Sequence, residues 1–117
     1  KNTGRRWNAA MKERGTLTES MFYVLMSFLR GQMCGIEITE FVEWKTNGRV
    51  RLGPGTLYTL LGKFQEEGLI RETEIQGRKR SYQITEAGRA AFREELARLR
   101  ACVDDGEEES AWTEQEK

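Results

Sequence analysis

Residues 53–70 read GPGTLYTLLGKFQEEGLI, and this stretch decides the fold. Pro54 fits a first helical turn, because its φ is already fixed and its missing amide would be unpaired there. Gly68 suits the position just after a helix end. Between them, apolar residues recur at helical spacing and form one stripe, made of Leu57, Leu60, Leu61 and Phe64. The stretch therefore predicts a helix that buries one side and leaves the other free.

The free side of this helix is small and able to form hydrogen bonds. Gly55 and Gly62 each cost about 1 kcal/mol in a helix relative to alanine, so two of them favour a steric reason for their presence. Such a face suits close approach to a phosphate backbone and a DNA groove, although an ordinary solvent-facing surface is the plainer alternative. The residues that we expect to contact DNA from this helix are Gly55, Thr56, Tyr58, Thr59 and Lys63.

A hairpin follows the helix, because the apolar period changes after Gly68. The runs 69–75 and 79–84 are strand-like and are joined through residues 76–78. Strict alternation would place Glu72 and Glu74 on one side of the first strand and Thr73 on the other. The tip carries three cations that are suited to phosphates or to a narrow minor groove, namely Arg78, Lys79 and Arg80.

Two helices are predicted before residue 53. Thr16 and Glu19 have the spacing of a capping box, so the first helix should begin at Thr16 and end at Gly31. The second should cover residues 35–45, with Asn47-Gly48 as its stop.

The last predicted helix begins after Thr85, a good N-cap, and ends near Val103. Its apolar residues are spaced four, three and four apart, which is the pattern of a helix-packing seam. So small a domain offers no obvious internal partner for this seam, and we therefore expect a homodimer. The interface would combine residues of the first and last helices, namely Phe22, Met26, Leu29, Phe92, Leu96, Leu99 and Val103. Phe22, Met26, Trp44 and Phe92 are also candidates to line a small-molecule pocket at an interface, with plain core packing as the alternative.

Charge is segregated along a chain whose net charge is zero. Residues 1–14 carry a net charge of +4, residues 45–80 also +4, and residues 104–117 carry −6. This pattern predicts a local surface for a polyanion. We expect a basic arm over residues 1–15, a DNA-binding domain over 16–84, a dimerisation helix over 85–103 and a disordered acidic tail over 104–117.

Several classes of function lack the residues they need. The chain has no histidine, and its two cysteines, Cys34 and Cys102, have no CxxC spacing. We therefore expect no metal site, no cofactor and no enzymatic activity. The sequence shows no apolar run long enough to cross a bilayer, and a cytoplasmic protein is expected.

Two segments resemble known regulators. Residues 55–70 are similar to the recognition-helix signature of the PadR family, and residues 77–89 are similar to its wing and the start of its last helix. The resemblance covers about residues 16–103 and is to the short members, with one helix after the wing. Ile36 departs from it, because the family usually has an aromatic residue there. The resemblance implies a homodimer on a palindromic site in double-stranded DNA, and many relatives are repressors released by small aromatic or drug-like molecules.

The expected fold is mainly α with a small β-hairpin, a winged helix-turn-helix followed by a dimerisation helix. The expected function is that of a sequence-specific transcriptional regulator, a repressor by analogy with the family. The alternative is a winged-helix module that binds proteins and not DNA. A DNA mobility shift that depends on salt would separate the two.

Overall fold

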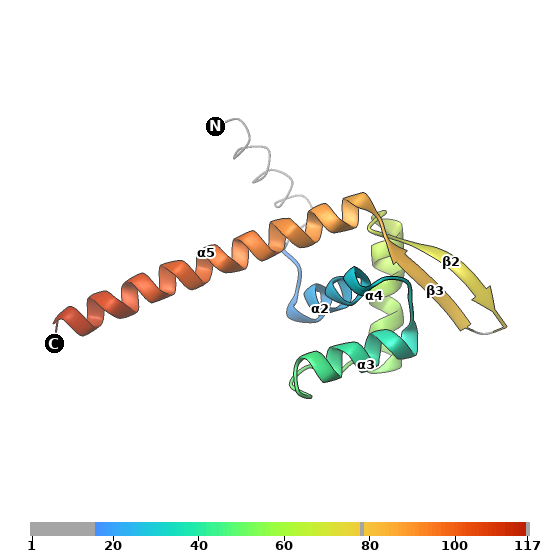
Figure 1. The fold of residues 1–117 in the computed structure, drawn as a ribbon, viewed down its shortest axis with the longest axis horizontal. Helices are drawn as coiled ribbons and strands as arrows, with labels where there is room; N and C mark the ends of the chain where they lie inside the picture. The colour runs from blue at the N-terminus through green and yellow to red at the C-terminus, as the bar shows by residue number, and fades with distance from the viewer. Residues whose placement is uncertain (1–15, 78, 117) are drawn as a thin grey trace.

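The computed structural model describes residues 16–77 and 79–116, so the predictions for Arg78 and for the arm over residues 1–15 lie outside the described residues. Within the described residues, three α-helices precede a hairpin and one long helix follows it (Figure 1). In chain order the elements are α2 (Glu19–Ser27), the 3-10 turn η1 (Phe28–Arg30), β1 (Met33–Cys34), α3 (Gly35–Lys45), α4 (Pro54–Glu66), β2 (Ile70–Gln76), β3 (Lys79–Ile84) and α5 (Glu86–Glu116).

The start predicted for the first helix is wrong by two residues. Thr18 is the N-cap, and its hydroxyl oxygen accepts a hydrogen bond from the Met21 amide at 3.1 Å. Glu19 becomes the first helical residue, and its carboxylate pairs with Arg49 and does not cap the helix. Thr16 and Thr18 both have a suitable side chain, and the long-range ion pair available to Glu19 is not visible in local spacing.

The core lies where the first three helices meet. Leu57, Leu61 and Phe64 are buried along one side of α4, as the stripe predicts, while Leu60 is partly buried beside them. They pack with buried residues of α2, η1 and α3, chiefly Val24, Leu25, Phe28, Ile38 and Val42. This burial fixes which side of α4 remains outside.

The turn between α3 and α4 is held by a buried threonine. The Thr46 hydroxyl donates to the Val42 carbonyl at 2.8 Å, and its oxygen accepts from the Val50 amide at 3.0 Å. Asn47 and Gly48 both have positive φ, at 56° and 78°, so the predicted stop of α3 is confirmed.

The sheet has three strands in the order β1–β3–β2. The hairpin is confirmed, but the short strand β1 was not predicted, because two residues carry no readable alternation. It pairs Met33 with Tyr82 and Cys34 with Ser81. A bulge between Glu72 and Glu74 breaks the register, since Glu72 pairs with Tyr82 and Glu74 with Ser81. The predicted strict alternation across residues 72–74 is therefore wrong.

Helix α5 is tied to the hairpin at its start. The Thr85 side chain accepts from the Gly88 amide at 3.1 Å and donates to the Gly68 carbonyl at 2.7 Å, so the predicted N-cap is confirmed. The first turns of α5 pack on α2. Glu95 is buried in this part of α5 and forms an ion pair with Arg98. Hydrogen bonding to Glu95 raises the pKa of Arg98.

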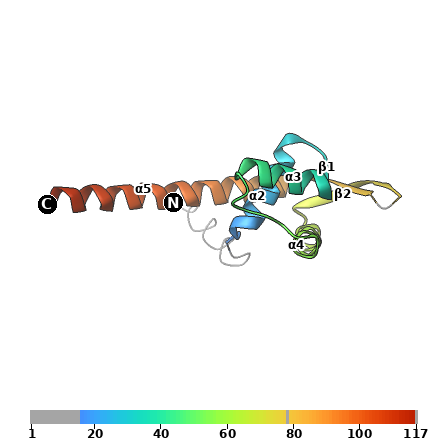
Figure 2. The same ribbon diagram turned by 90° about the horizontal axis from the view of Figure 1, so that it is seen from below.

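The predicted end of the last helix near Val103 is wrong, because α5 continues to Glu116 and extends away from the domain (Figures 1 and 2). Glutamate and alanine are good helix formers, and Asp104, Asp105 and Gly106 disfavour a helix far less than proline would. The chain's only proline is Pro54. Residues 100–112 are all exposed, so the acidic segment is a helix surface and not a disordered tail. Among the described residues, no helix is long and apolar enough to cross a membrane.

Two glycines of α5 should respond in opposite ways to the same substitution. A Cβ at Gly88 would lie 2.1 Å from the Leu69 carbonyl oxygen, whereas one at Gly106 would meet open space. We expect Gly88→Ala to destabilise the protein by about 2–3 kcal/mol, since backbone atoms must move. Gly106→Ala should stabilise it by up to about 1 kcal/mol. Urea unfolding of both variants measures this, and a neutral Gly88→Ala would contradict the described packing of α5 on the hairpin.

Candidate nucleic-acid interface

The outer side of α4 carries the residues that the sequence selects for DNA contact. Gly55, Thr56, Tyr58, Thr59 and Lys63 are all exposed, on the side away from the buried stripe. The helix begins at Pro54 after an extended Gly53, and no described side chain caps it. Its first amides are thus open to an anion, which the helix dipole also favours.

The start of α3 lies beside the start of α4. Glu37 caps the first turn of α3, because its carboxylate accepts a hydrogen bond from the Cys34 amide at 2.9 Å. That hydrogen bond holds the pKa of Glu37 below its usual value. Tyr58 lies over Gly35 so closely that a Cβ there would be 2.6 Å from the tyrosine hydroxyl. The two helix starts therefore form one surface with Tyr58 between them.

An open hollow of about 400 Å³ connects this surface to the wing. It brings together Tyr58, Lys79 and Arg80, three of the predicted contact residues, and both cations are exposed. The other lining residues are Cys34, Gly35, Ile36 and Glu37. The remaining predicted residues of α4 lie outside the hollow, on the outer face of the helix.

Ile36 and Glu37 are parts of this site that the sequence analysis did not select. Ile36 is 72% exposed at the rim of the hollow, although it is apolar. The signal that could have indicated it is its position directly after the first residue of a helix that adjoins α4. An exposed isoleucine there has no role in the core and offers an apolar contact to a ligand in the hollow.

Arg80 has a carboxylate close behind it. Glu72 Oε2 lies 3.9 Å from Arg80 Nε, and this oxygen is buried without a hydrogen-bond partner among the described residues. Tyr82, the strand partner of Glu72, is buried as well. Burial raises the pKa of the Tyr82 phenol, and the charge of Glu72 raises it further.

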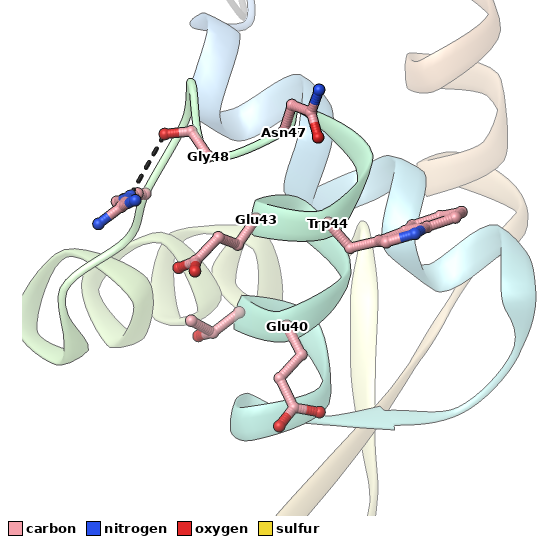
Figure 3. A pocket seen from close by; sticks show the side chains of 7 residues that line it. Glu40, Glu43, Trp44, Asn47 and Gly48 are labelled. Carbon is pink, nitrogen blue, oxygen red and sulfur yellow. Dashed lines mark hydrogen bonds between the residues drawn. The ribbon is translucent and has the colours of Figure 1, made fainter.

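A second hollow, of about 460 Å³, lies along α3 and the turn that follows it (Figure 3). Glu40 and Glu43 are exposed at it, and Figure 3 shows Glu43 and Trp44 on different sides of the helix. Arg51 also lines this hollow, and its Nε donates to the Gly48 carbonyl at 3.3 Å. Two exposed carboxylates repel phosphate, so this hollow marks where a surface suited to DNA ends.

The residues predicted to form a dimer interface fall into three groups. Phe22 and Phe92 are buried and stacked on each other within one chain, with ring centroids 4.9 Å apart. Met26 and Leu99 are partly buried at the edge of the core. Leu29, Leu96 and Val103 are 41%, 39% and 57% exposed, which leaves them available to a partner.

The residues suggested for an interface pocket have other neighbours within the single chain. Trp44 lies against Phe41, with ring centroids 6.0 Å apart, and the Arg30 guanidinium is 5.5 Å from its ring. The rings of Phe22 and Phe92 instead stack on each other. The described residues also contain no group of three or more metal-binding side chains.

The described residues form three helices followed by a two-stranded wing, and a third strand ties the wing to the second of these helices. This arrangement defines a winged helix-turn-helix protein. Residues 24–94 match the transcriptional regulator PadR-like family, and the chain belongs to that family. Its fold and family are those of transcriptional regulators and not of enzymes.

Known proteins are similar to this chain in sequence or in fold. An uncharacterized 37.1 kDa protein in transposon TN4556 of Streptomyces fradiae is 34% identical over 88 residues, which are 73% of this chain. The match spans about a quarter of that relative, 25% of its length. A transcriptional regulator from Clostridium thermocellum, Cth-833, superposes with a TM-score of 0.69 at 19% identity, over 75% of this chain and 89% of that one. Bacillus subtilis PadR, solved in complex with operator DNA, superposes with a TM-score of 0.58 at 24% identity, over 65% of this chain and 45% of that one.

The contact between Gly35 and Tyr58 can be tested by a double-mutant cycle. Gly35→Ala should destabilise the protein by about 1 kcal/mol, because the new Cβ pushes the tyrosine hydroxyl aside. Most of that loss should disappear in a Tyr58→Phe background, which lacks the hydroxyl. Urea unfolding of the wild type, both single variants and the double variant gives the coupling. Additive losses would mean that Tyr58 does not lie over Gly35.

Proposed function

We propose that this protein is a sequence-specific transcriptional repressor that acts in the cytoplasm as a homodimer on an inverted-repeat operator. The observation that carries the proposal is the hollow between the starts of α3 and α4 and the wing, with Lys79 and Arg80 beside it. It joins a helix with an open, uncapped start to two exposed cations, which is the arrangement that a sugar–phosphate backbone requires.

The outer face of α4 is the proposed reading surface. Thr56 and Thr59 are short and exposed, and each can bond a base edge or pack its methyl group on thymine. Tyr58 and Lys63 have the reach for phosphates, and Gly55 lets the helix start approach the DNA closely. In a two-fold dimer, two such helices should be about 34 Å apart, or a multiple of that.

The wing is proposed to supply mainly sequence-independent affinity. Lys79 and Arg80 face solvent at the hollow, and Arg78 is next to them in sequence. Each cation that neutralises a phosphate releases a counterion, so these residues should set the dependence of binding on salt.

The dimer is proposed to form through α5 and the side of α2 and η1 that faces it. Leu29, Leu96 and Val103 remain exposed in the single chain and lie next to the partly buried Met26 and Leu99. Burial of this apolar surface against a second copy of the chain would remove it from water and so favour the dimer. A small aromatic or drug-like effector that releases the repressor would then bind between copies or in an open hollow, because Phe22 and Phe92 fill their own space.

A winged-helix module that binds only proteins is the second candidate. The exposed acidic helix surface over residues 104–112 favours it, since such a surface suits a basic protein partner. The two candidates differ in DNA binding, which should weaken steeply between about 50 and 200 mM salt for the repressor and be absent for the module.

Selection of bound sites from a random DNA pool at defined salt tests the repressor. We expect an inverted repeat for the wild type, altered base preferences for Thr59→Ala, and unchanged preferences with weaker binding for Tyr58→Phe. The reason is that a threonine on α4 reads bases while the tyrosine hydroxyl contacts phosphate. Circular dichroism controls for folding. Identical preferences in the wild type and a Thr56/Thr59 double-alanine variant would move the reading surface away from α4.

The dimer is tested by placing a charge in its proposed interface. Leu96→Glu should give monomers, because a carboxylate buried between two apolar helix faces is strongly unfavourable. Sedimentation equilibrium of the wild type and the variant measures the change. Ala97→Glu is the matched control, because Ala97 is exposed and lies outside the proposed interface. It should leave the dimer intact. A dimer unaffected by Leu96→Glu would contradict the assignment.

A further inference from the structure

We propose that Glu72 is a positioning residue that restrains Arg80 of the wing and thereby weakens binding to arbitrary DNA more than binding to the operator. The inference rests on the proposed DNA-binding function and goes beyond it, because it assigns a role in selectivity to an anion inside a site for anions.

The placement of Glu72 is unusual for a carboxylate. It lies on β2 directly before the bulge, opposite the buried Tyr82 on β3. Its side chain is only 23% exposed, and Oε2 is buried without a hydrogen-bond partner in the described part of the chain. A buried oxygen left unpaired is unfavourable, so such an atom calls for an explanation.

The ion partner of this carboxylate belongs to the proposed DNA surface. Arg80 Nε is 3.9 Å from Glu72 Oε2, which is too long for a hydrogen bond but close enough for electrostatic attraction. Arg80 itself is 58% exposed and lines the hollow with Tyr58 and Lys79. Glu72 therefore attracts the guanidinium, while more than half of the Arg80 side chain remains exposed to a ligand.

A phosphate that approaches Arg80 has to compete with Glu72 for it. The carboxylate attracts the guanidinium and repels the phosphate, so an ordinary backbone contact gains less than it would from a free arginine. A narrow minor groove has a stronger negative potential and can draw the arginine away from its partner. Arg80 would thus add a preference for a narrow minor groove to a wing affinity that is otherwise independent of sequence.

Glu72→Gln is the direct test, since it removes the charge and keeps the size. The full-length dimer is titrated with a random-sequence duplex and with the selected operator across a salt series. We expect affinity for the random duplex to rise about 3- to 10-fold, with the slope of log K against log salt steeper by up to about 0.9. Operator affinity should rise less, so the ratio of operator to random binding falls.

Three further variants separate this role from simpler ones. Glu43→Gln makes the same change in net charge at an exposed position on α3, beside the second hollow and outside the proposed DNA surface, and it should leave the ratio unchanged. Glu72→Met should behave as Glu72→Gln does, which keeps the test valid if one of them folds poorly. In an Arg80→Ala background, Glu72→Gln should have no effect on the salt slope.

The outcomes that overturn the inference are distinct from those that overturn the function. Equal gains from Glu72→Gln with and without Arg80 would show a general field effect, and a folded Glu72→Gln dimer with unchanged random-duplex affinity would show no restraint. Either result ends the inference. Failure of the wild type to bind any duplex would instead reject the DNA-binding function itself.

Discussion

The burial of one side of α4 is the constraint on which the rest of the structure depends. Leu57, Leu61 and Phe64 pack against α2, η1 and α3, and this packing leaves the helix no freedom to rotate about its axis. The side that carries Thr56 and Thr59 is therefore outside for a reason of packing. The same packing places the start of α3 beside that of α4, where Tyr58 lies over Gly35. The surface proposed to read DNA is thus the side of α4 that core packing leaves exposed.

The wing is fixed to this core at two places. β3 is the central strand, and its pairing with β1 ties the wing to the residues just before α3. At the other end, Thr85 bonds back to Gly68 at the end of α4, and Gly88 lies against Leu69. The cations of β3 therefore keep a defined position relative to α4. A restraint on Arg80 by Glu72 acts in the same direction, because it limits the one freedom that a long arginine side chain retains.

Local signals in the sequence are sufficient for the elements with strong end markers. Pro54 and Gly68 bound α4, Asn47 and Gly48 end α3, and Thr85 begins α5, so those bounds agree with the structure. The misses come from effects that local patterns do not carry. A two-residue strand and a bulge depend on pairing partners, and local spacing does not separate Thr16 from Thr18, the observed N-cap. The exposure of the proposed contact residues of α4 follows from its apolar stripe, whereas the hollow at Ile36 requires knowledge of how two helices pack.

The length of α5 has a mechanical consequence. A straight helix of 31 residues is about 46 Å long, and only its first turns are anchored to the domain. The helix is anchored as far as Leu99, because Phe92 and Glu95 are buried and Leu99 packs at the edge of the core. Residues 100–116 form a lever about 25 Å long beyond that point. A bend of about 8° where the packing ends would displace the far end by about 3.5 Å. Small strains near Leu99 are therefore magnified at the tip of α5.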